Sequence, residues 1–252
     1  ARNGRTGCYA NLDGTSSAGW ESFTIGLTGL AVLAFQSLGY THHDGEFKQT
    51  IGRGLGYLRD CQDNDGGFGH AATRHVGSHM LQHALATLAL LEACALTESI
   101  SLRSSVHRGL DFLLAAQHRD PDLGDLGWRY ASHSGSSDPH VTAWCVLVLA
   151  VARSQGFPVP QHAFDGARRL FALRTGPVEF AGGTYYRTGY LTRASRNVRL
   201  PGINEHFARN DALNALHVFA RCLLEPEEFD VNRDPALHQQ AQGLAAVRPS
   251  WN

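Results

Sequence analysis

A repeated helical block constrains the fold of this chain more than any other feature of its sequence. Aligning the 252 residues with themselves at an offset of 55 places the block 53–58, followed by Gln62, over the block 108–113, followed by Gln117. Each copy then runs into a glycine and an aromatic residue, and a weaker third copy begins at Gly166. A fixed period of this length is typical of repeat architectures built from helix pairs. We therefore expect stacked helical hairpins.

Apolar and amphipathic segments alternate along the chain and set the boundaries of these hairpins. We predict hairpins at about 22–61, 79–117, 140–173 and 205–247. The first helix of each is apolar nearly all round, which predicts a buried inner helix, and the second has a charged face, which predicts an outer helix. The fold class is therefore all-α, an α/α toroid with inner and outer helix rings in one domain, 1–252. An irregular insertion is expected at about 177–202.

Composition supports one globular domain and argues against several partner classes. With 43% hydrophobic and 18% charged residues, the chain can bury a large core. A net charge of -1 and a pI near 7.0 give no basic surface for nucleic acid. No apolar run reaches the roughly 20 residues of a membrane span, so a soluble protein is expected. The first residue is Ala1 rather than Met, which is compatible with a periplasmic or secreted part of a longer precursor, but the sequence does not specify the compartment.

The five cysteines favour buried free thiols over disulfides or a cysteine metal site. They are odd in number, widely spaced and contain no CxxC pair, and three of them lie in apolar helical patterns.

The helix, glutamine and glycine-aromatic pattern resembles the QW repeat of squalene and oxidosqualene cyclases. The alternation of inner and outer helices is shared with protein prenyltransferases. The phrases at 80–93, 127–130, 138–144 and 234–237 are most similar to bacterial prenyltransferase/squalene oxidase repeat proteins without an assigned reaction. The resemblance covers about four fifths of the chain and implies the toroid. A complete toroid of this superfamily has about six hairpins. With four predicted here, either the ring is partial or the remaining hairpins lie outside this sequence.

The repeated glutamine and aromatic positions have a structural interpretation that is independent of the family. A glutamine at the end of an outer helix can bond open backbone groups of the next helix, and the aromatic residue can pack against that junction. We expect this structural role of the positions Gln62, Phe68, Gln117 and Trp128.

The chemistry known for the superfamily does not fit this sequence. The D-x-D-D-T-A motif of protonating cyclases corresponds to residues 138–143, which read D-P-H-V-T-A, with His140 in place of the acid. An imidazolium with a pKa of about 6.5 is too weak an acid to protonate an isolated alkene. The D-x-C pair of prenyltransferases and the C-G-E-Q sequence of thioester domains are both missing. Cyclisation, thiolate prenylation and thioester capture are therefore not expected.

In such rings the inner helices begin at one mouth, and polar residues there are the candidates for a site. The candidate catalytic residues are His140, Asp138 and Glu205. The candidate ligand-binding residues share a predicted place at or near this mouth: Trp20, Glu21, His83, His206, Arg209, Asp211 and Tyr186. Tyr186 lies in the insertion, which is rich in tyrosine and arginine and is interpreted as a lid or partner-binding element, or as a solvated loop or short hairpin.

Two histidines at i and i+4 raise the alternative of a metal site. His79 and His83 would share one helix face, and such a pair is a common half of a zinc site. Asp138 or His140 could complete it. The competing interpretation is that these histidines are hydrogen bonded at a helix start and that no cofactor is bound.

Three functions remain open at this point. The leading one is a non-cyclising domain that binds an apolar or isoprenoid-like small molecule, or a protein segment, at the ring mouth. The second is an enzyme, a hydrolase, lyase or transferase, that uses the His, Asp and Glu candidates with or without zinc. The third is a structural scaffold module.

Overall fold

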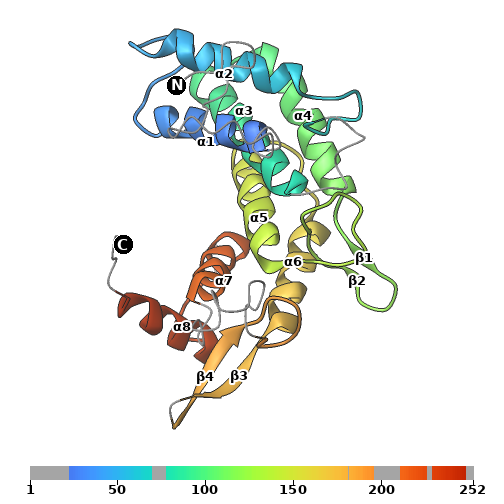
Figure 1. Cartoon of the computed structure of the whole chain (residues 1–252), viewed down its shortest axis with the longest axis vertical. Coiled ribbons are helices and arrows are strands. Elements are labelled where there is room, and N and C mark those ends of the chain that lie inside the picture. Colours follow the sequence, from blue (N-terminus) through green and yellow to red (C-terminus); the bar gives the residue numbers. More distant parts are fainter. Residues whose placement is uncertain (1–22, 70–77, 181, 196–210, 226–228, 248–252) are drawn as a thin grey trace, which may run out of the picture. The chain divides into compact units, whose positions relative to one another are not determined.

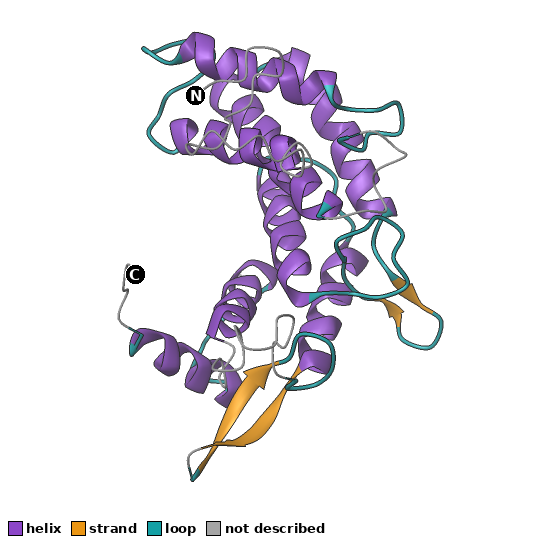
Figure 2. Ribbon diagram, viewed as in Figure 1, coloured by secondary structure: helices purple, strands orange, loops and turns teal. Residues whose placement is uncertain are grey.

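The computed structural model of the chain describes residues 23–69, 78–180, 182–195, 211–225 and 229–247. Within these ranges helix dominates, and the strands form two small two-stranded sheets (Figure 2). The predicted all-helical character is confirmed at this level, and each predicted helix corresponds to an observed one. The elements in chain order are α1 (Thr24–Gln36), α2 (Lys48–Asp60), α3 (His79–Thr97), α4 (Ile100–Ala115), β1 (Arg119–Asp120), β2 (Gly124–Asp125), α5 (Pro139–Ser154), α6 (Gln161–Arg174), β3 (Thr175–Phe180), β4 (Gly183–Thr188), α7 (Asp211–Leu224) and α8 (Pro235–Ala245).

The chain divides into two compact units (Figure 1). Unit 1 comprises residues 1–117, 130–134 and 151–159, and unit 2 comprises residues 118–129, 135–150 and 160–252. Unit 1 therefore contains α1 to α4, and unit 2 contains both sheets, α6 to α8 and most of α5. The predicted toroid, with its two rings of helices, stays a prediction.

Unit 1 is built around α3. This helix is rich in leucine and alanine, and most of its residues are buried. The α1 helix packs closely along it because Gly26 and Gly29 face it: a Cβ atom on Gly29 would lie 2.9 Å from the carbonyl oxygen of Leu85. Gln36 of α1 donates a hydrogen bond to the carbonyl oxygen of Ala89 (3.1 Å). Backbone contact and a buried amide thus join the two helices.

The burial of the apolar helices follows the prediction for α3 but not for α1. Leu27 and Leu30 of α1 are 49% and 43% exposed, because only one face of that helix packs against α3. Within the described ranges, α3 is the helix whose length and composition would suit a membrane span, and 67% of that stretch is buried in the structure, as in the core helix of a globular unit.

The repeated glutamine of unit 1 joins neighbouring elements, as expected. The Gln62 amide donates to the carbonyl oxygens of Ser105 in α4 (2.9 Å) and of Gly66 (3.0 Å), and its oxygen accepts from Arg108 (2.8 Å). Phe68, after the glycine turn, is buried. In unit 2 the equivalent Trp128 is also fully buried. The structural interpretation is confirmed for Gln62 and for the burial of both aromatic residues.

In unit 2 the predicted irregular insertion begins as a regular hairpin. Strands β3 and β4 are antiparallel, with Thr175 opposite Thr188. Residues 175–188 form a short hairpin, and the part of the predicted insertion at 196–202 lies outside the described residues. Its role as a lid or partner-binding element stays a prediction. The outer edge of β4 is covered by amide side chains: the Gln239 oxygen accepts from the N–H of Tyr186, and the Gln239 nitrogen donates to the carbonyl of Thr184 (2.9 Å). An amide placed in this way replaces the peptide group of a third strand.

The cysteines that the structure describes are free thiols. Cys94 and Cys145 are buried, Cys61 and Cys222 are half-buried, and Cys8 lies outside the described residues. Burial raises the pKa of Cys94, Cys145 and Cys222, so these sulfurs stay protonated at neutral pH.

Candidate functional site

The predicted site residues separate into three groups. Trp20, Glu21, Glu205, His206 and Arg209 lie outside the described residues. His79 and His83 lie in unit 1. Asp138, His140, Tyr186 and Asp211 lie in unit 2.

The candidate catalytic carboxylate of Asp138 caps a helix. Its Oδ1 accepts the backbone N–H groups of His140 (2.8 Å) and Val141 (3.1 Å), which are otherwise open donors at the start of α5. Asp234 makes the same pair of bonds at the start of α8, and a proline follows each aspartate. The shared D-P phrase thus encodes a helix start. Asp138 is fully buried, and its Oδ2 has no hydrogen-bond partner among the residues that the structure describes.

The histidine pair of unit 1 is close together, as predicted, and hydrogen bonded to the backbone. The ring centroids of His79 and His83 are 6.2 Å apart. His79 Nε2 donates to the carbonyl of Phe68 (2.8 Å), and His83 Nε2 donates to the carbonyl of Gly109 (2.9 Å). His83 Nδ1 accepts the N–H of Phe68 (3.4 Å). Both nitrogens of His83 are therefore engaged, and ligation of a metal by His83 would break one of these bonds.

No group of three or more metal-ligating side chains occurs in the described ranges. Zinc at His79 and His83 stays a hypothesis.

Tyr186 and Asp211, both predicted as ligand-binding residues, line the same hollow in unit 2. This hollow of about 280 Å³ lies over β4, α7 and α8. Its lining consists of two tyrosines, four amide side chains, one carboxylate and one glycine: Tyr185, Tyr186, Asp211, Asn214, Gln239, Gln240, Gln242 and Gly243. Because aromatic faces contact C–H groups while amides and carboxylates bond hydroxyl groups, this lining suits a ligand with both.

A chain of buried hydrogen bonds fixes the orientation of the lining amides. The backbone N–H of Thr188 donates to the Asn214 oxygen (2.9 Å), so that oxygen is assigned by a fixed donor. The Gln240 amide lies 3.2 Å from the same oxygen, and its nitrogen must therefore face it. The Gln240 oxygen then faces His217 Nδ1 at 2.8 Å. An amide oxygen only accepts, so Nδ1 of His217 carries the proton.

The resulting tautomer leaves the Nε2 lone pair of His217 inside unit 2. His217 is 2% exposed, stacks on Phe171, and its Nε2 has no hydrogen-bond partner in the described structure. Burial is the main cause that lowers its pKa to about 4, and the bond to Gln240 opposes this in part. His217 is therefore neutral at physiological pH and holds the amides behind the hollow.

Sequence analysis missed this network. Asn214 and His217 are three residues apart on α7, and Gln240 lies on the next helix, so the sequence offered polar residues at helical spacing. Asn214 and His217 are polar residues on the buried face of an amphipathic helix, and this position was the sequence signal that could have indicated the network. The strand partner could not be predicted, because the sequence left a loop and a short hairpin both open for the segment that forms β4.

No protein-family model matches the chain, and no curated protein matches it.

Proposed function

We propose that the chain is a binding domain and that the hollow of unit 2 takes a hydroxyl-rich ligand of the carbohydrate class, without cyclase or prenyltransferase chemistry. One observation supports this most: the side chains of Tyr186, Asp211 and Gln242 share one hollow whose amides are held by the buried Asn214–Gln240–His217 network. A rigid set of donors and acceptors next to aromatic faces binds at low entropic cost.

The lining favours a polar occupant over the isoprenoid-like one. Asn214, Gln239 and Gln240 use part of their bonding capacity on the protein, while the side chains of Asp211 and Gln242 have no hydrogen bond within the described ranges. An apolar ligand would remove water from these groups without replacing its bonds, which costs about 1–3 kcal/mol for each group. A sugar has hydroxyl pairs that can satisfy them.

Binding is favoured over glycoside hydrolysis because the described lining holds a single carboxylate. Hydrolases of most families use two, one on each side of the bond that breaks. Asp211 is the only acidic residue among the described residues of the hollow.

A titration with trisaccharides tests the proposal. Maltotriose, cellotriose and chitotriose are added to the ¹⁵N-labelled chain, and the side-chain amide signals of Gln239 and Gln242 are followed by NMR, with farnesol as the apolar comparison. We expect one trisaccharide to shift these signals. Asp211→Asn should weaken its affinity by about tenfold or more, since a charge-assisted hydrogen bond is lost. Asp122→Asn, at an exposed position outside the hollow, is the control.

A second pair of variants separates binding in the hollow from binding elsewhere. A Cβ atom on Gly243 would meet nothing within 4 Å, so a side chain there projects into open space. Gly243→Leu should abolish the shifts and Gly243→Ala should preserve them. Shifts that persist in Gly243→Leu, or farnesol binding without sugar binding, would contradict the proposal.

A further inference from the structure

A second hollow lies in unit 1, where it faces solvent and is lined by cationic and neutral side chains. Its volume is about 690 Å³, and its lining is His42, His43, Lys48, Gln49, Gly52 and Arg53. No carboxylate is among these residues. Within the described structure, the side chains of Lys48 and Arg53 have no ion pair or hydrogen bond. Their positive charges are therefore available to a ligand.

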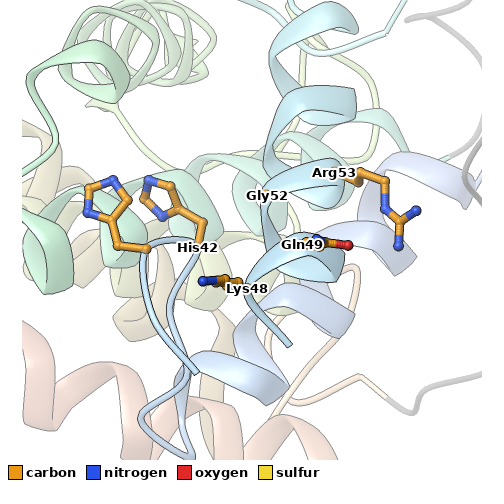
Figure 3. A pocket seen from close by; sticks show the side chains of 6 residues that line it. His42, Lys48, Gln49, Gly52 and Arg53 are labelled. Carbon is orange, nitrogen blue, oxygen red and sulfur yellow. The ribbon is translucent and has the colours of Figure 1, made fainter. Parts of the chain in front are cut away.

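The geometry of α2 explains why these residues share one surface. At about 100° per residue, Lys48, Gly52, Gln49 and Arg53 follow one another over an arc of about 140° on the helix. Figure 3 shows the His42 ring and Lys48 on one side of Gly52 and Arg53 on the other. A Cβ atom on Gly52 would touch only the Cβ atom of His42, at 3.9 Å, so the glycine leaves a bare strip of backbone between the charges.

The two histidines of this hollow, His42 and His43, lie against each other at one end of it. Their ring centroids are 4.2 Å apart, and His42 Nδ1 is buried without a hydrogen-bond partner. Burial, and then the neighbouring His43, lowers the pKa of His42. Asp44 and Glu46 follow in the same loop, where both are exposed, and no carboxylate is among the causes of the shift. The α1 side of the loop packs through the aromatic rings of Phe35, Tyr40 and Phe47. A bound anion would supply the missing negative charge.

We propose that this hollow binds a small soluble anion of the phosphate class, with Lys48 and the two imidazoles holding one anionic group and Arg53 the other end of an extended ligand. The site is separate from the hollow of unit 2 and does not depend on its function. Amines and guanidinium groups are the usual partners of phosphate oxygens, and a protonated imidazole adds both a donor and a charge.

The sequence offers a direct probe, because Lys48 is the only lysine of the chain. Acetylation of its amine by a limiting amount of reagent is followed by mass spectrometry, with and without inorganic pyrophosphate at constant ionic strength. We expect pyrophosphate to slow the modification of Lys48 at least fivefold and to leave the N-terminal amine unchanged. Equal protection by sodium chloride alone would overturn the proposal.

The affinity of variants for pyrophosphate, measured by calorimetry, tests whether the anion binds in this hollow. Lys48→Gln should lower the affinity about tenfold, whereas Arg59→Gln, which removes an exposed charge from the same helix outside the hollow, should change it less than twofold. Gly52→Leu should block the hollow, and Gly56→Leu is its matched control, since a Cβ atom there meets nothing within 4 Å and Gly56 is outside the lining. Equal losses in each pair, with all variants folded by circular dichroism, would refute a defined site.

The pH dependence and the source of the anion complete the test. Sulfate stays a dianion between pH 5 and 8, so its affinity reports the protein's own titration. The affinity for sulfate should rise as pH falls, by up to about tenfold per pH unit, because a protonated imidazole attracts the anion. His42→Gln together with His43→Gln should flatten this profile. Binding to phosphatidylserine vesicles without binding of pyrophosphate would overturn the assignment to a small soluble anion.

Discussion

The two units each bury a histidine, but hold it in opposite ways. In unit 1, His83 bonds backbone groups with both nitrogens, Nδ1 to the N–H of Phe68 and Nε2 to the carbonyl of Gly109. In unit 2, His217 is held through Nδ1 by the side chain of Gln240, and its Nε2 has no hydrogen-bond partner in the described structure. The first histidine carries its proton on Nε2 and the second on Nδ1.

This difference separates a structural histidine from one that belongs to a site. His83 forms hydrogen bonds with the backbone of a turn and of a helix, and these bonds lie within the core of unit 1. His217 holds amides that also line a hollow, so a change at its ring is passed to groups that a ligand would meet. The same residue type, equally buried, thus has different consequences in the two units.

The largest expected effect comes from removing the backbone-bound histidine. His83→Leu leaves the N–H of Phe68 and the carbonyl of Gly109 buried without this partner, which should lower the free energy of unfolding by about 4 kcal/mol. His217→Leu removes the close partner of the Gln240 oxygen and the longer contacts of Nδ1 with the hydroxyls of Thr175 and Thr188, which keep their bond to each other. The other nitrogen that it removes has no partner in the described structure, so the variant should cost about half as much. Urea unfolding, followed by hydrogen exchange in each unit, measures both. Equal losses would remove the distinction between the two histidines.

Much of unit 1 could be predicted from the sequence, and less of unit 2. The repeat predicted the helices on both sides of Gln62 and the role of its amide, because short-range periodicity and a glycine turn determine them. Asp138 was predicted as a catalytic candidate from its place at the predicted ring mouth. An aspartate and a proline at a helix start also have a local structural meaning, which is the cap that the structure shows. The hollow of unit 2 was predicted only through Tyr186 and Asp211, since its amides are brought together by a strand edge and two helices far apart in sequence.

The second largest effect should come from acid. The folded pKa of His217 is about 4, below its ordinary value of 6.5, so between these values the unfolded chain binds the proton first. The stability that neutral His217 contributes is fully present above pH 6.5 and is lost as pH falls. The loss in the free energy of unfolding amounts to about 3 kcal/mol by pH 4. Unfolding of the wild type and of His217→Leu between pH 4 and 7 should show this slope in the wild type and a shallower one in the variant. Parallel slopes would show that His217 is not buried as described.

A pair of amides gives a smaller effect that distinguishes stability from binding. Gln62→Ala in unit 1 and Gln240→Ala in unit 2 each remove an amide with several partners, and each should cost about 1–2 kcal/mol. Only Gln240→Ala should also weaken trisaccharide binding, because it releases Asn214 and His217 behind the hollow. The NMR titration measures affinity and chemical denaturation measures stability. A loss of sugar affinity in Gln62→Ala would show that the units are not functionally distinct.

The smallest expected effect is a gain in stability at the glycine of each hollow. Gly52 in α2 and Gly243 in α8 are helical residues, and a Cβ atom would contact only His42 Cβ at 3.9 Å in the first case and nothing in the second. Alanine at either position should raise the free energy of unfolding by about 0.5–1 kcal/mol, because it restricts the unfolded chain without a clash. Gly54, on the same helix as Gly52, is the contrast: its Cβ atom would lie 2.7 Å from Val32 Cγ2, so Gly54→Ala should destabilise unit 1. Thermal unfolding of the three variants ranks them. A gain in stability at Gly52 and Gly243 would mean that packing does not require glycine at either position. The remaining difference between glycine and a larger residue there is that glycine leaves the helix backbone open to a ligand.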